Sequence, residues 1–148
     1  MKLSGRTPLG TLVDDFMRGM HRYDAGRTLP MLHKANLTTP HIAALEFVRE
    51  PQTVSAVATF LGLSRPAASQ MIDKLVRGKL LNRVESSTDR RERHIVLSVK
   101  GRSLVERIAQ ARAARFEASL AVLPAPVAAR LSSVLQEVVV SLTRRAPR

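Results

Sequence analysis

Hydrophobic residues recur at helical spacing along most of the chain, between prolines and glycines that interrupt the pattern. The first apolar stripe follows the i, i+3, i+4, i+7 rule and consists of Leu9, Leu12, Val13, Phe16, Met17 and Met20. Two longer helices are expected at residues 100–122 and 126–144, on either side of Pro124. The pattern therefore predicts a mainly helical protein with amphipathic helices at both ends.

Shorter helices are predicted in the middle of the chain, over about residues 40–49, 55–61 and 64–77. Thr39 suits the N-cap of the first, because Pro40 then takes the first helical position, and Thr53 suits the cap of the second. The period then changes, and residues 81–84 and 93–99 are typical of two short strands joined by a polar turn. The predicted fold class is therefore mainly α with a small β-hairpin, and residues 37–99 form one compact lobe.

The helices at the two ends lie outside this lobe, and each carries a strong apolar stripe. Exposed stripes of this size are unfavourable on a soluble monomer. Residues 8–33 and 100–145 are therefore expected to pack together and against a second copy. The residues expected at this dimer contact are Leu9, Leu12, Val13, Phe16, Leu131, Leu135, Val138 and Leu142.

The charge balance points to a class of partner. The chain has 24 Lys and Arg residues against 12 Asp and Glu, which gives a formal net charge of +12. A surplus of this size favours a polyanionic partner, with nucleic acid first and an anionic membrane surface second. An arginine content that only reflects base-rich codons is the alternative.

Other classes are excluded by what the sequence lacks. Cysteine is absent, which excludes disulfide scaffolds and thiolate zinc sites. No run of about 18 apolar residues occurs, so neither a membrane-spanning helix nor a membrane partner is expected. The segment from Met1 to Arg6 has no apolar core behind its charges, unlike a secretory signal, and the cytoplasm is the expected compartment.

The segment from Val54 to Lys74 has the organisation of a helix-turn-helix. Gly62 allows a left-handed turn between the two helices, and the small Ala58 lets them cross closely. Ser64 can cap the second helix, whose N-terminal N–H groups and positive dipole suit a phosphate. The residues expected in the core of this unit are Val57, Leu61, Leu63, Ala68 and Met71.

The exposed face of the second helix carries side chains suited to DNA. Gln and Ser can read base edges, while Arg and Lys can pair with guanine or with phosphates. The expected DNA contacts on this helix are Ser64, Arg65, Ala67, Ser69, Gln70, Lys74 and Arg77, with Asp73 on the same face. An ordinary solvated helix face is the alternative.

The predicted hairpin carries arginines at its tip, among them Arg90 and Arg91. Arginine at this position suits the narrow minor groove, where the potential is most negative. Asp89 could hold Arg91 in place through a charged hydrogen bond. A polar turn with balanced charges is the alternative.

In these features the chain resembles the MarR-type (multiple antibiotic resistance regulator) winged helix-turn-helix transcriptional regulators over nearly all of its length. The most specific match is Asp89-x-Arg91, followed in register by Leu97 and Gly101. The segment Leu37–Pro40 is similar to the entry of the family's second helix.

Two positions depart from the family pattern. Ser98 replaces the usual threonine, and both residues can cap the helix that follows. Lys79 stands where glycine commonly follows the recognition helix, with Gly78 one position early. The helix would therefore end one residue sooner.

The resemblance implies a homodimer, a recognition helix that begins at Ser64 in the major groove, and Arg91 in the minor groove. The wing residues expected on DNA are Arg83, Ser87, Asp89, Arg90 and Arg91. The resemblance also implies that a small aromatic or anionic effector can bind between the dimer helices and the lobe. His21, His33 and His41 could meet such an anion, and the effector site stays unassigned.

Catalytic and cofactor motifs are not found in the sequence, so neither an enzyme nor a bound cofactor is expected. A metal site built from His21, Asp24 or His41 lacks paired ligand spacing and is not expected. The favoured hypothesis is a homodimeric, sequence-specific double-stranded DNA-binding regulator at the cytoplasmic nucleoid. It would act as a repressor on a pseudo-palindromic operator, although activation is equally compatible with the sequence. A non-specific architectural DNA-binding protein and a winged helix that binds a protein partner are the alternatives.

Overall fold

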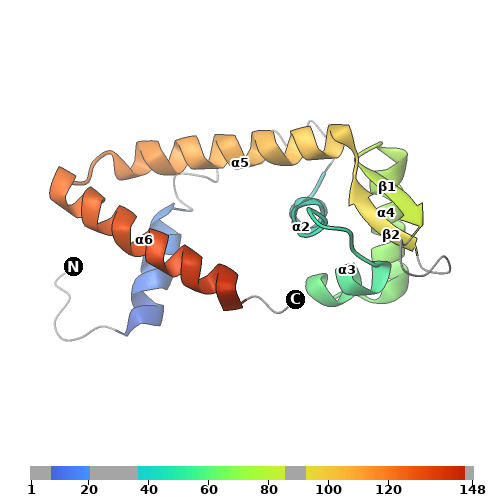
Figure 1. Ribbon diagram of the computed structural model, residues 1–148, viewed down its shortest axis with the longest axis horizontal. Helices are drawn as coiled ribbons and strands as arrows, with labels where there is room; N and C mark the ends of the chain where they lie inside the picture. Colours follow the sequence, from blue (N-terminus) through green and yellow to red (C-terminus); the bar gives the residue numbers. More distant parts are fainter. Residues whose placement is uncertain (1–7, 21–36, 86–92, 146–148) are drawn as a thin grey trace. The chain divides into compact units, whose positions relative to one another are not determined.

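The computed structural model describes residues 8–20, 37–85 and 93–145 of the chain. The chain forms two compact units. The central unit is Asp24–Arg112, and the terminal unit combines Met1–Tyr23 with Ala113–Arg148. The long helix α5 (Val99–Leu120) begins in the central unit and ends in the terminal unit (Figure 1).

The central unit contains the short helices α2 (Thr39–Phe47), α3 (Val54–Leu61) and α4 (Arg65–Arg77) (Figure 1). All three were predicted from the hydrophobic pattern. The cap of α3 is also confirmed, because Thr53 Oγ1 accepts the N–H of Ala56 at 3.1 Å.

The cap of α2 lies one residue earlier than predicted, at Thr38 instead of Thr39. Nδ1 of His41, in the first turn of the helix, accepts the N–H of Thr38 at 3.0 Å. This bond fixes the helix start, and Pro40 then takes the second helical position, where its missing N–H has no intrahelical partner to lose.

A left-handed turn separates α3 from α4, as predicted. Gly62 has a φ of +63°, a region that glycine adopts without the steric cost of a Cβ. The next N–H, that of Leu63, donates to the carbonyl of Ala58 at 2.9 Å, and the side chain of Ala58 is buried. A small residue at this point therefore allows the close crossing of the two helices.

The predicted hairpin is confirmed and consists of β1 (Leu81–Glu85) and β2 (Arg93–Leu97), which pair antiparallel. Strand β2 is two residues shorter than predicted, because α5 begins directly after it. Gln52 adds a bridge that the sequence did not reveal, exchanging two main-chain hydrogen bonds with Ile95 at 2.7 and 3.1 Å. A single bridging residue has no periodicity, so sequence reasoning had no signal for it.

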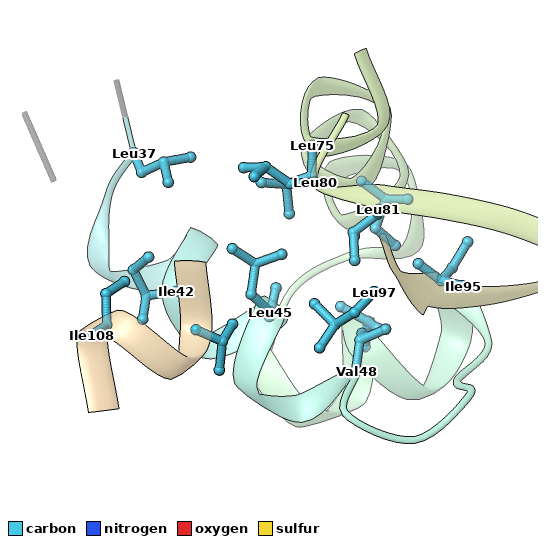
Figure 2. Packing of buried hydrophobic residues seen from close by; sticks show 14 residues of the cluster. Leu37, Ile42, Leu45, Val48, Leu75, Leu80, Leu81, Ile95, Leu97 and Ile108 are labelled. Atoms are coloured by element: carbon cyan, nitrogen blue, oxygen red, sulfur yellow. The ribbon is translucent and has the colours of Figure 1, made fainter. Parts of the chain in front are cut away.

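The core of the central unit lies where α2, α4, the hairpin and the first turns of α5 meet (Figure 2). Leu45, Ile72, Leu81 and Ile95 are fully buried there. Each such side chain stabilises the fold by about 1.5–3 kcal/mol relative to an exposed one. Among the predicted core residues, Val57 and Ala68 are fully buried and Leu61, Leu63 and Met71 are partly buried.

The start of α5 is anchored to the turn that follows α4. Ser98 Oγ accepts the N–H of Gly101 at 2.9 Å and donates its own hydrogen to the carbonyl of Lys79 at 2.7 Å. The predicted capping role of Ser98 is therefore confirmed. A Cβ on Gly101 would overlap the carbonyl oxygen of Leu80, so this close approach requires glycine.

The described part of the terminal unit contains a helix over residues 9–20, the end of α5, and α6 (Ala125–Arg145). Its apolar side chains are largely exposed in the single chain: 76% for Leu9, 57% for Val139 and 65% for Leu142. Leu9 and Leu142 were predicted at the dimer contact, whereas Val139 was not. The other residues predicted there are partly buried to about half exposed: Leu12, Val13, Phe16, Leu131, Leu135 and Val138.

Helix α6 corrects the expectation about membrane spans. Within the described residues, Ala125–Leu142 is long and apolar enough to cross a membrane by length and composition, with a mean hydropathy of 1.2. However, Arg130, Ser133 and Glu137 recur on one side of the helix at i, i+3, i+7 spacing. A polar stripe opposite an apolar one is typical of a helix that packs against another protein surface.

Candidate nucleic-acid interface

The N-terminus of α4 is capped as predicted, since Ser64 Oγ accepts the N–H of Ala67 at 3.3 Å. The N–H of Ala68 donates to the carbonyl of Ser64 at 3.0 Å, and Pro66 has no N–H. Among the described donors at this helix end, the N–H groups of Ser64 and Arg65 remain for a phosphate. The sequence had suggested several free donors, so the anion site at this end is weaker than expected.

Side chains of α4 divide between the core and solvent as predicted. Ala68, Ile72 and Leu75 are buried, whereas Gln70, Lys74 and Arg77 are exposed. The exposed three lie at i, i+4, i+7 and therefore follow one line along the helix. An amide followed by two cations on one line can place a base-reading group beside two phosphate contacts.

The remaining predicted residues of α4 lie beside this line or at the helix start. Arg65 is exposed at the first helical position, while Ala67, Ser69 and Asp73 are partly buried. All seven predicted contacts therefore belong to the solvent side or its margin.

An ion pair connects α4 with the hairpin. The guanidinium of Arg83, on β1, lies 2.5 Å from the carboxylate of Asp73, on α4. Both side chains are partly exposed, so the pair adds at most about 1 kcal/mol to stability. The ion pair matters for the arrangement of the two elements, because it joins the hairpin to α4 and so orients the hairpin relative to the exposed face of this helix. Sequence reasoning named both residues but not their contact, since no pattern relates a helix to a strand ten residues away.

Ser87, Asp89, Arg90 and Arg91 lie outside the described residues, so their roles remain predictions. The described strands end at the pair of Glu85 and Arg93, directly before and after the tip.

The connection after α4 adopts an unusual backbone at Lys79. The helix ends at Arg77, as the position of Gly78 had suggested. Gly78 keeps a right-handed φ of −71°, whereas Lys79 takes the left-handed value of +58°. Main-chain bonds from Lys79 and Leu80 back to the helix hold this turn at 2.9 Å each. An L-residue in this region costs about 1–2 kcal/mol, so lysine occupies a position that favours glycine.

His41 has a structural role at α2. Burial, and to a smaller extent the charge of Lys74, lower the pKa of His41, which favours the neutral ring that can accept the hydrogen bond from Thr38. His21 and His33 lie outside the described residues. Among the side chains that the structure describes, no three His, Asp or Glu are grouped to hold a metal ion.

The central unit is a winged helix-turn-helix. It has three helices, of which the last two form the helix-turn-helix, and an antiparallel hairpin follows directly after them. Residues 35–92 match the model of the MarR family, which confirms for this part of the chain the resemblance found in the sequence. A search of curated proteins finds no match.

Solved structures extend the likeness in fold beyond this segment. Transcriptional regulator Tm0710 of Thermotoga maritima is similar with a TM-score of 0.74 and 16% identity, over 97% of this chain and 100% of that one. RV1404 of Mycobacterium tuberculosis is similar with a TM-score of 0.72 and 20% identity, over 97% and 100% of the two chains. A MepR mutant of S. aureus bound to an oligodeoxyribonucleotide gives a TM-score of 0.60 and 20% identity, over 93% and 99%. At these identities the likeness establishes a shared fold.

Proposed function

We propose that this protein is a homodimeric transcriptional regulator that binds a specific, two-fold-symmetric site in double-stranded DNA and acts as a repressor. The line of Gln70, Lys74 and Arg77 on the exposed face of α4 carries the proposal. The Asp73–Arg83 ion pair holds the hairpin beside this face, and the net charge of +12 supplies attraction to phosphates. The DNA-bound MepR structure supports the same use of the fold.

In this proposal, residues 37–99 form the DNA-binding lobe, and residues 8–33 and 100–145 form the dimer. The exposed apolar residues of the 9–20 helix and α6 support a covered surface there. A two-fold dimer places its recognition helices on half-sites about 10 bp apart, or a multiple of that. Such a protein acts in the cytoplasm, on the nucleoid.

A binding selection tests the function. Purified protein is incubated with a random double-stranded DNA pool at about 150 mM salt, where non-specific binding is already weakened. Enrichment of a two-fold-symmetric motif is expected. Retention of DNA without a motif would support the non-specific architectural alternative, which the net charge of +12 also favours. Retention of no DNA would contradict both.

A further inference from the structure

The start of α2 is held by a hydrogen bond in which a histidine ring is the acceptor. Nδ1 of His41, the third residue of the helix, accepts the main-chain N–H of Thr38 at 3.0 Å, and Thr38 Oγ1 lies 2.6 Å from the same nitrogen. Glutamate or glutamine usually supplies the acceptor at this position of a capping box. An imidazole differs from both, because it can gain a proton between pH 5 and 8. The proposed DNA contact does not use this bond.

Protonation of the ring is incompatible with this bond. Accepting the N–H of Thr38 requires the lone pair of Nδ1, so the bond exists only while this nitrogen carries no proton. An imidazolium has a hydrogen on both ring nitrogens and can only donate. Its Nδ1–H could still donate to Thr38 Oγ1, but the N–H of Thr38 would then face a second donor. Protonation therefore removes the acceptor that fixes the helix start.

The surroundings of His41 also disfavour a positive ring. The first turn of α2 places the ring at the positive end of the helix dipole, and the residue is only 8% exposed, so an imidazolium would lose most of its hydration. Burial, followed by the charge of Lys74 on α4, lowers the pKa of His41. Lys100 and Arg107, on α5, line one cavity with Lys74 and Leu37, so the groups beside the start of α2 add further positive charge.

Acidic side chains on the helices around the ring are engaged elsewhere or lie in solvent. Glu46, on α2, is bound to Arg112 of α5 at 2.8 Å. Asp73, on α4, is bound to Arg83 of the hairpin. Helix α3 carries no charged residue, and Glu106 of α5 is exposed. An imidazolium at this position would therefore lack a counter-ion among the described residues.

The cap lies next to apolar contacts that hold α2 in the core. Leu37, directly before the cap, and Ile42, directly after His41, both belong to the buried cluster and are 8% exposed (Figure 2). Without the acceptor on His41, the first turn of α2 loses the side-chain bond that satisfies its entry. Local opening of this turn, together with the leucine in front of it, then costs less free energy.

We propose that Thr38 and His41 form a pH-sensitive cap, which holds the start of α2 at neutral pH and releases it when His41 gains a proton in mildly acid solution. The device belongs to the fold of the central unit and does not depend on the proposed DNA contact. Its contribution to stability is present above the ordinary pKa of histidine, about 6.5, and is lost as the pH falls through the lower pKa of the folded chain.

An NMR titration of the full chain tests the cap directly. The ring resonances of His41 are expected to titrate with a midpoint below that of a histidine in a peptide. The amide resonance of Thr38 should shift with the same midpoint, because its N–H loses the acceptor. A titration of His41 that leaves the amide of Thr38 unchanged, or a midpoint at or above the peptide value, would overturn the proposal.

A variant isolates the contribution to stability. His41→Gln keeps an acceptor at the third helical position and removes the titration. Urea unfolding is measured at pH 7.5 and pH 5.0, at one protein concentration because association would also contribute. On going to pH 5.0, the equilibrium constant for unfolding should rise about two- to tenfold more in the parent chain than in His41→Gln, as loss of one hydrogen bond does. Equal pH dependence of the two chains would overturn the proposal.

A matched control removes a histidine from another element. His94→Gln changes a residue of β2, outside the cap, and should keep the pH dependence of the parent chain. If His94→Gln abolished the pH dependence as His41→Gln does, the effect would not belong to the cap and the proposal would be overturned. The NMR titration uses the parent chain, so it decides the question even if a variant does not fold.

Discussion

The central and the terminal unit differ in how far their apolar side chains are buried. In the central unit Leu45 and Ile72 have no exposed surface, whereas in the terminal unit Leu9 and Leu142 are exposed by 76% and 65%. The central unit thus has a core that a single chain completes. The terminal unit has amphipathic helices whose apolar stripes remain uncovered, which is the property that the proposed dimer explains.

Backbone strain and close packing occur in the unit whose core is complete. Both described residues with a left-handed φ, Gly62 and Lys79, lie in the central unit, as does the close approach at Gly101. A complete core can hold such features in place because many contacts oppose their relaxation. Substitutions should therefore act mainly on folding in the central unit and mainly on association in the terminal unit.

The largest effect on folding is expected from Gly101→Ala. The added methyl group would overlap the carbonyl oxygen of Leu80, so the start of α5 must shift, and the free energy of unfolding should fall by about 3 kcal/mol or more. Gly19→Ala is the matched change in the terminal unit, where a Cβ meets nothing within 4 Å. It should raise stability by about 0.5–1 kcal/mol through helix propensity. Urea unfolding measures both, and equal effects would contradict the comparison.

The next effect concerns association. Val138→Glu places a charge on the apolar stripe of α6, once in each protomer, and should weaken the proposed dimer by at least about 100-fold because the charge must be desolvated. Ser133→Glu adds the same charge to the polar stripe and should leave the dimer intact. Sedimentation equilibrium gives the two dissociation constants. An intact Val138→Glu dimer would show that this stripe is not the contact.

The sequence predicted the elements of the central unit better than their mutual contacts. Helical spacing, caps at Thr53 and Ser64, and the change of period at the hairpin are local signals, and all were confirmed. The Asp73–Arg83 pair and the Gln52–Ile95 bridge depend on how elements meet in space, which no local pattern encodes. The terminal unit is the reverse case, because its apolar stripes are evident in the sequence while their partner surface is not.

An effect on specificity is expected from Gln70→Ala, at the N-terminal end of the exposed line on α4. Each well-made base contact contributes about 1–3 kcal/mol, so loss of the amide should relax preference at one base pair per half-site. Arg77→Gln, on the same line, should weaken all sequences alike and reduce the salt dependence by about one charge. Competition binding with single-base variants of the selected motif distinguishes the two. A uniform loss for Gln70→Ala would assign this residue to the DNA backbone, and neither change should alter the dimer.

The smallest effect tests the turn between α4 and β1. Lys79→Gly removes the steric cost of a left-handed L-residue from the folded state. Glycine also makes the unfolded chain more flexible, which offsets part of this gain. The expected net increase in the free energy of unfolding is about 0.5–1 kcal/mol. Lys79→Ala removes the charge and keeps the left-handed cost, and should stay within about 0.5 kcal/mol of the parent chain. Urea unfolding of both variants separates backbone conformation from charge. An equal gain in the two would mean that relief of like-charge repulsion near Lys74 and Lys100, and not the left-handed backbone, limits the stability of this turn.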